Sequence, residues 1–188
     1  GNNELTLEAE NEPIVMKKLQ LRQVEELDDY VVYSQKQPES NMTAEGLNYI
    51  QIIQGEDSTL RSESSLYAKY DGSSPTTQPN SVTNTVLNYV GGEAWRSSGQ
   101  WIEWEFEVPE DGFYKIMVKG RQNYARGSVS TRCVYIDGEV PFKEMKNISF
   151  GYENDWNCFE LANEEEIPYE FYLTKGRHTL RMEASLGD

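Results

Sequence analysis

Apolar and charged side chains alternate along the middle of the chain, between residues 101 and 119, as they do in a half-buried β-strand. The apolar positions of the first run are Ile102, Trp104, Phe106 and Val108, and glutamates occupy the positions between them. A second alternating run, with Lys115 and Lys119 on its polar face, follows the turn at residues 109–112. This pattern predicts a β-hairpin with a four-residue loop, in which glutamates and lysines match across the outer face.

Other segments show the same period of two. They are residues 49–54, 132–137, 169–173 and 178–184, and in the last of these Leu180, Met182 and Ala184 form the expected inward set. Many short alternating strands separated by Gly, Asn, Asp and Pro predict an all-β fold, an antiparallel β-sandwich or jelly roll. The polar stretch at residues 71–81 is predicted to be a long loop, the kind of segment that often carries binding function.

The region before the strands has a different period. Apolar residues recur at helical spacing at Leu21, Val24, Leu27 and Val31, which predicts one amphipathic helix over residues 13–33. We therefore expect two parts. Residues 1–46 form an N-terminal α-helical extension with a polar linker, and residues 47–188 form the β-sandwich module.

The charge balance excludes several classes of partner. The 188 residues include 17 Lys and Arg against 32 Asp and Glu, a formal net charge of -15. Nucleic acid and anionic membrane surfaces are bound through clustered basic residues, so neither is an expected partner. No stretch approaches the roughly 18 consecutive apolar residues of a membrane span, so direct membrane insertion is not expected. The first residues lack the features of a signal peptide, and we interpret the chain as a piece of a larger protein.

Catalytic motifs are scarce. The single histidine, His178, lies in a turn before the last predicted strand, where a structural role is expected. Acidic pairs are abundant in so acidic a chain, so two carboxylates at a glycosidase separation would arise by chance. The two cysteines, Cys133 and Cys158, are interpreted as buried free thiols, although one disulfide is an alternative. We do not expect an enzyme.

Aromatic residues are more informative, with 12 Tyr and 4 Trp in the chain. Sugars present flat C–H faces to rings, and their hydroxyl groups need fixed polar partners. The candidate ligand-binding residues at the rim of the sandwich are Trp95, Trp101, Tyr152, Trp156, Arg121 and Asn123. The alternative for each ring is packing between loops and strands.

Several short motifs occur in an order that resembles carbohydrate-binding modules of families 6 and 35. They are Ile52 to Asp57, Gly99 to Trp104, Val108 to Tyr114, Ile136-Asp137-Gly138 and Thr174 to Leu180. The resemblance implies a galactose-binding-like β-sandwich over residues 47–188. A further resemblance, to modules in bacterial extracellular solute-binding proteins of sugar ABC transporters, is carried by Leu87 to Gly92, Arg121-Gln122-Asn123, Arg132, Tyr135 to Glu144, Tyr152, Asp155-Trp156 and Leu186-Gly187-Asp188.

The resemblance also implies specific sites. Families 6 and 35 bind a structural calcium, and the matching positions here are Gln54, Glu56 and Asp188 as metal ligands. Gln54 replaces one of two acidic ligands, which weakens or removes the site, because calcium prefers carboxylates among its oxygen ligands. In family 6 modules two aromatic residues flank one sugar cleft, and by order these would be Trp101 and Trp156, with Arg121 nearby. The long segments at residues 71–81 and 121–131 would cover or reshape that cleft.

The resulting hypothesis is a non-catalytic carbohydrate-binding module of a bacterial cell-surface protein. The module would help to capture a glycan or oligosaccharide for uptake, and it would be extracellular, with other domains of the same parent protein as partners. One alternative is a structural or interdomain module without sugar affinity. A second alternative is a polysaccharide-cleaving enzyme that uses an acidic pair.

Overall fold

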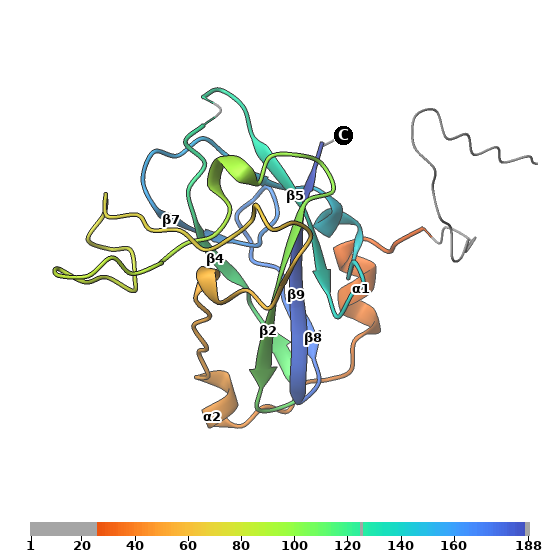
Figure 1. Ribbon diagram of the computed structural model, residues 1–188. Helices are drawn as coiled ribbons and strands as arrows, with labels where there is room; N and C mark the ends of the chain where they lie inside the picture. Colours follow the sequence, from red (N-terminus) through yellow and green to blue (C-terminus); the bar gives the residue numbers. More distant parts are fainter. Residues whose placement is uncertain (1–25, 125, 187–188) are drawn as a thin grey trace, which may run out of the picture.

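The computed structural model describes residues 26–124 and 126–186, and these form two packed layers of antiparallel strands (Figure 1). The first layer is a five-stranded sheet in the order β1-β2-β9-β5-β6. Its strands are β1 (Leu60–Arg61), β2 (Trp101–Val108), β5 (Ser130–Ile136), β6 (Ile148–Phe150) and β9 (Gly176–Ser185). The second layer contains two strand pairs: β3 (Gly112–Tyr114) with β8 (Phe171–Leu173), and β4 (Met117–Gly120) with β7 (Asn157–Glu160). The predicted all-β sandwich is therefore confirmed.

Short helices connect or flank these strands. They are α1 (Tyr30–Lys36), α2 (Ala44–Leu47) and three 3₁₀ turns, η1 (Gly55–Asp57), η2 (Gly92–Ala94) and η3 (Lys143–Lys146). Among the residues that the structure describes, no helix is both long and apolar enough to cross a bilayer.

The core lies between the two layers and follows the predicted alternation. Ile102, Trp104 and Val108 of β2 are buried, and so are Met182 and Ala184 of β9. They pack against Leu173 and Phe171 of the opposite layer and against Val134, Ile136 and Phe142. Because the inward positions of β2 and β9 match the sequence pattern, the outward residues of these strands are also known, and Trp101 is one of them.

The predicted hairpin at residues 101–119 is wrong. The turn after Val108 carries the chain from one layer to the other, so β2 pairs with β9 and β3 pairs with β8. The outer glutamates of β2 therefore meet β9, where Glu103 is opposite Arg181 and Glu107 is opposite Arg177. The sequence pattern gave each strand its inward face, but local alternation carries no information about which strand lies beside it.

Residues 49–54 were predicted to form a strand, but they run alongside β2 without joining the sheet. Their side chains bond the edge of β2: the Tyr49 hydroxyl donates to the carbonyl of Glu107 at 3.0 Å, and Gln51 Oε1 accepts from the Glu107 N–H at 3.2 Å. Ile50 and Ile52 are 83% and 79% exposed. The alternating pattern here thus places apolar side chains in solvent.

The helix prediction was partly wrong. Residues 13–25 lie outside the described part of the chain, Leu27 is not helical, and α1 begins at Tyr30 with Asp29 as its N-cap. Val31 is 60% exposed, whereas Tyr30 and Tyr33 pack on the core. Their hydroxyl oxygens accept from the N–H groups of Glu170 and Tyr172, at 3.0 and 3.1 Å. The helix thereby covers the edge of β8 that does not pair with β3, and it binds backbone N–H groups that would otherwise lack a partner strand.

Candidate functional site

Arg121 and Trp156 lie directly beyond the end of the β4–β7 ladder, whose last pair is Gly120 with Asn157. Side chains alternate along each strand, and Lys119 opposite Cys158 defines the outward face. The next outward pair is Arg121 and Trp156. The guanidinium carbon of Arg121 lies 4.9 Å from the Trp156 ring centroid, so a cation stacks on the indole on the outside of this layer.

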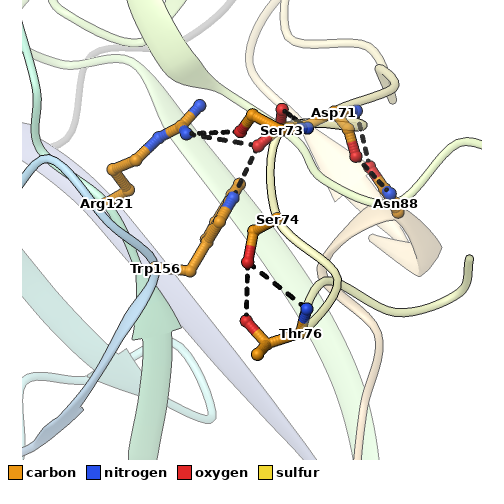
Figure 2. Close-up of polar contacts among 7 residues, drawn as sticks. All are labelled: Asp71, Ser73, Ser74, Thr76, Asn88, Arg121 and Trp156. Carbon is orange, nitrogen blue, oxygen red and sulfur yellow. Dashed lines mark hydrogen bonds and ion pairs between the residues drawn. The ribbon is translucent and has the colours of Figure 1, made fainter.

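Asp71 joins these two side chains from the long loop (Figure 2). The indole N–H of Trp156 donates to Asp71 Oδ2 at 2.6 Å, and Arg121 Nη1 lies 3.2 Å from the same oxygen. Arg121 also donates to the hydroxyl of Ser73 at 3.2 Å. The ring is therefore held in one orientation by a carboxylate and a guanidinium that are themselves paired.

The loop that supplies Asp71 is anchored at its base by Asn88, which is only 6% exposed. The Asn88 amide oxygen accepts from the Asp71 N–H at 2.8 Å, and its nitrogen donates to the carbonyls of Asp71 and Pro79, at 2.9 and 3.2 Å. Farther out, Lys119 donates to the carbonyl of Thr76. The predicted loop at residues 71–81 is confirmed, and these contacts fix it over the outer side of β4.

Tyr89 completes the aromatic part of the site. Its ring meets Trp156 edge-on, with centroids 5.8 Å apart and an interplanar angle of 62°. Burial raises the pKa of Tyr89, and so do the nearby Tyr124 and Asp71. Tyr67 and Tyr124 are 55% and 66% exposed. The site therefore contains two rings, Trp156 and Tyr89, that meet at an angle and form a corner, and two exposed tyrosines lie nearby.

The electrostatic balance keeps Asp71 ionised. Burial by itself raises the pKa of this carboxyl group, but hydrogen bonds from Ser73 and Trp156 and the charge of Arg121 outweigh it and hold the pKa below its usual value. The ionised carboxylate at the indole N–H and the guanidinium over one face of the ring present fixed acceptors and donors beside Trp156. The carboxylate is poorly suited to act as a general acid, which must carry a proton.

Trp101 lies elsewhere, so the structure does not form the single cleft that the resemblance implied. It belongs to the outward face of β2, opposite Glu183, and Arg181 stacks on its ring at 4.1 Å. Trp156 lies on the outward side of the other layer. The order of residues along the chain matched the family, but the two rings face away from each other across the core.

Trp95 is a packing residue. Its indole N–H donates to the carbonyl of Gln100 at 2.9 Å, the guanidinium of Arg132 covers its ring at 4.3 Å, and Trp104 packs beside it with centroids 6.5 Å apart. This ring is held between the loop at η2 and the core. The sequence left open whether each aromatic ring binds a ligand or packs between loops and strands. Trp95 packs.

Tyr152 and Asn123 lie on the two loops that carry Trp156 and Arg121. The N–H of Glu153 donates to the carbonyl of Gln122 at 2.8 Å, which ties these loops together. Tyr152 is half-buried and donates to Asn154 at 2.8 Å, and Asn123 is half-buried as well. Sequence reasoning missed Asp71, Asn88 and Tyr89. The signals were that Asp71 opens the long polar loop and that Asn88 and Tyr89 belong to the motif Leu87 to Gly92, which carries the second resemblance.

The calcium ligands fit in part. Glu56 Oε2 is a buried carboxylate oxygen without a hydrogen-bond partner, and burial, followed by the charge of Asp57, raises the Glu56 pKa despite a bond from its own N–H. A bound cation would satisfy such an oxygen. Gln54 is half-buried two residues away, and Asp188 lies outside the described residues. Within residues 26–124 and 126–186, no group of three or more His, Cys, Asp and Glu could hold a metal.

Both cysteines are free thiols, as predicted, but Cys158 is exposed and Cys133 is only half-buried. The expectation that both are buried was therefore wrong. Cys158 lies opposite Lys119 on the outward side of β7. The sequence pattern predicted a strand here, but it did not show which side chains of that strand point inward.

No model of a protein family matches the sequence, and neither does any curated protein. Solved structures that are similar to this chain include a family 35 carbohydrate-binding module from Clostridium thermocellum, at 17% identity and a TM-score of 0.49 over 72% of this chain and 85% of that one. A second is a Paenibacillus cycloisomaltooligosaccharide glucanotransferase, at 20% identity and a TM-score of 0.49. A third is a Podospora anserina GH26-CBM35 β-(1,4)-mannanase, at 12% identity and a TM-score of 0.48.

The aligned region is only 15% of the glucanotransferase and 24% of the mannanase. It includes 70% and 72% of this chain, respectively.

Proposed function

We propose that this chain is a non-catalytic carbohydrate-binding module whose sugar site is the corner formed by Trp156, Tyr89, Arg121 and Asp71. The observation that carries the proposal is the fixed Trp156 ring: it lies on the outside of the sandwich, with a carboxylate at 2.6 Å from its nitrogen and a guanidinium at 4.9 Å from its centroid.

This arrangement fits the chemistry of a glycan. An indole offers a flat apolar surface to sugar C–H groups. The Asp71 carboxylate accepts hydrogen bonds from hydroxyl groups, and the Arg121 guanidinium donates them. Because the opposite charges are already paired, the site suits an uncharged ligand. So few contacts support a weak complex, with a dissociation constant on the order of 0.1–1 mM, about 4–5.5 kcal/mol.

The test is a titration followed by intrinsic tryptophan fluorescence, with plant and host glycans as ligands. We expect a saturable change with at least one glycan class and its loss in Trp156→Ala. Trp101→Ala is the matched control, because Trp101 is also a half-buried, outward tryptophan under an arginine. Equal binding by wild type and Trp156→Ala would contradict the proposed site.

The setting of the module is a further part of the proposal. We place it outside the cell, on a bacterial surface protein that captures oligosaccharides for uptake, with other domains of that protein as partners. The support is the motif order that is similar to modules of sugar ABC transporter components, together with a net charge of -15 that suits neither nucleic acid nor an anionic membrane.

Calcium belongs to the proposal as a structural ion, with Glu56, Gln54 and Asp188 as its ligands. The support is the unpartnered, buried Glu56 Oε2. We expect millimolar calcium to raise the melting temperature of the wild-type chain and to leave Glu56→Gln unchanged. An identical melting temperature with calcium and with a chelator would remove the metal from the proposal.

An interdomain module without sugar affinity is the second candidate. It is favoured by one observation, the exposed apolar side chains of Leu47, Ile50 and Ile52 beside the edge of β2, which are 72%, 83% and 79% exposed. In this case Ile50→Ser with Ile52→Ser would weaken association with the remainder of the parent protein, and no glycan would change the tryptophan fluorescence. At the Trp156 corner, Asp71 is paired with Arg121 and ionised, which does not suit it as the acid of a glycan-cleaving pair.

A further inference from the structure

A polar pocket lies beside the Trp156 site and belongs to none of the candidates above. It is a wide depression that is largely open to solvent, with a volume of about 410 Å³. Its polar lining residues are Ser65, Lys69, Glu93, Arg96, Ser97 and Gln100. They come from the segment after β1 and from the loop that contains η2.

Gln100 gives this pocket a rigid wall. It is 6% exposed, and its amide oxygen accepts from the N–H groups of Arg96 and Ser97, at 3.0 and 2.9 Å. Its nitrogen donates to Glu63 Oε2 at 2.9 Å, and the same oxygen accepts from the Ser65 hydroxyl at 3.1 Å. The loop is therefore held in place before any ligand arrives, which lowers the entropic cost of binding.

The charges of the pocket are mixed. Lys69 Nζ donates to the carbonyl of Gly91 at 3.0 Å and has two further protons to donate. Glu93 and Arg96 form an exposed pair at 3.7 Å. An anionic ligand would meet Glu93, and a cationic ligand would meet Lys69 and Arg96. Donors and acceptors in such proximity suit neighbouring hydroxyl groups, each of which both donates and accepts.

The pocket and the Trp156 site share one stretch of chain. Lys69 pairs with Tyr89 in an isolated β-bridge, with the Lys69 N–H donating to the Tyr89 carbonyl at 2.7 Å. Lys69 lines the pocket, and Asp71, two residues later, binds Trp156. In extended chain, side chains two residues apart lie on the same side and roughly 7 Å apart. One sugar chain would therefore contact both places.

We propose that this pocket is a second sugar subsite, so that the module binds an uncharged oligosaccharide along Glu93, Lys69 and Asp71 to Trp156. The inference rests on the proposed function and adds to it the class of ligand, a chain of several sugar units. It assigns Glu93 and Arg96 as residues that favour long glycans over single sugars.

The experiment measures binding of the full chain by isothermal titration calorimetry. The probes are glucose and mannose, and the hexasaccharides cellohexaose, isomaltohexaose and mannohexaose. The variants are Glu93→Gln and Arg96→Met, whose side chains are exposed enough to leave the fold intact. Their matched controls are Glu164→Gln and Arg177→Met, which change exposed residues elsewhere. Trp156→Ala reports on the proposed function itself.

We expect one hexasaccharide to bind at least about tenfold more tightly than its monosaccharide, which corresponds to about 1.4 kcal/mol. The two pocket variants would lose most of this advantage and keep monosaccharide affinity, and the controls would behave like wild type. Equal affinity for single sugar and hexasaccharide, or pocket variants that keep the advantage, would overturn the subsite and leave the Trp156 site standing. Absence of binding to every probe would overturn both.

Discussion

Two groups with the same chemistry lie on the two outer faces of the sandwich. Each contains a tryptophan, an arginine stacked on its ring and a carboxylate that pairs with the arginine. We call Trp101, Arg181 and Glu103 the sheet triad, and Trp156, Arg121 and Asp71 the loop triad. The stacking distances are 4.1 and 4.9 Å, and the shortest distances from arginine to carboxylate are 2.8 and 3.2 Å.

The two triads differ in where the carboxylate comes from. In the sheet triad Glu103 is directly opposite Arg181 in the β2–β9 ladder, and Glu103 Oε2 accepts from both Nε and Nη2 of Arg181 at 2.8 Å. In the loop triad Asp71 comes from a distant segment and also accepts from the indole N–H. In the sheet triad the charge pair links two neighbouring strands, whereas in the loop triad the carboxylate fixes the orientation of the ring that we propose as the sugar site.

Removing each ring gives the largest expected contrast. Trp156→Ala should lower glycan affinity by at least about tenfold, below detection for a site this weak, whereas Trp101→Ala should leave affinity unchanged. The reason is that Asp71 fixes the Trp156 indole N–H directly and the Tyr89 ring meets Trp156 edge-on, whereas the carboxylate of the sheet triad, Glu103, pairs with Arg181. Fluorescence titration and calorimetry measure both variants, with circular dichroism to confirm folding. A loss of binding in Trp101→Ala alone would move the sugar site to the sheet triad.

Removing each carboxylate charge should produce the opposite contrast in stability. Glu103→Gln removes the negative charge that accepts from both Nε and Nη2 of Arg181, in a site where the glutamate side chain is 9% exposed, at a cost of about 2 kcal/mol in the free energy of unfolding. Asp71→Asn should cost less than about 1 kcal/mol, because Arg121 has a single, longer contact to Asp71 at 3.2 Å and keeps its bond to the Ser73 hydroxyl.

Urea unfolding measures the stability of these two variants, and calorimetry measures their glycan affinity. We expect Asp71→Asn to weaken glycan binding and Glu103→Gln to leave it intact. The comparison between the triads would fail if Asp71→Asn destabilised the protein more than Glu103→Gln and had no effect on binding.

Acid should disrupt the loop triad only at low pH. The pKa of Asp71 lies below its usual value, so the stability that this carboxylate contributes is present above the ordinary Asp pKa of about 3.9 and is lost as the pH falls through the lowered value. We therefore expect glycan binding to persist at pH 5. A midpoint for the loss of binding at pH 5 or above, absent in Asp71→Asn, would show that Asp71 is not stabilised as described.

The smallest expected effect is that of His178 on the pH dependence of stability. His178 is not part of the loop triad, so its titration should change the stability of the fold without changing glycan binding. Its Nδ1 lies 2.7 Å from Asp137 Oδ2, and its Nε2 lies 2.6 Å from the Thr174 carbonyl. Burial lowers the His178 pKa, but these two acceptors outweigh it and raise the pKa above its ordinary value.

The stability from this imidazolium should be complete below about pH 6.5 and should be lost as the pH rises through the raised pKa. NMR titration of the imidazole measures the pKa, and urea unfolding between pH 6 and 8 measures the loss, with His178→Gln as the control. A pKa below that of a free histidine would contradict this account.

Part of the fold was predictable because one buried face leaves a regular trace in the sequence. The alternation in residues 102–108 and 178–184 named the inward residues of β2 and β9 correctly. The same alternation in residues 49–54 was misleading, because side chains of this segment bond the edge of β2 while Ile50 and Ile52 remain in solvent. Spacing shows that two faces differ, but not which face is buried.

The candidate site was predictable only in fragments. Trp156 and Arg121 could be named from the sequence, since aromatic and planar charged residues in loops suit a sugar. The roles of Asp71 and Asn88 could not be named, although Asn88 lies in the motif Leu87 to Gly92, because no local pattern indicates that a carboxylate 85 positions before Trp156 will bond its indole N–H.

By itself, the sequence of this protein determined the class of fold and the inward face of its main strands, because burial of alternate side chains is a local property. It also determined the excess of acidic charge, which is a sum over residues. Only the tertiary structure decided that Trp101 and Trp156 lie on opposite faces, and that Asp71 and Arg121 meet at one ring. Those relations depend on which strands pair and where the chain crosses between layers, and pairing is decided by packing of the whole core.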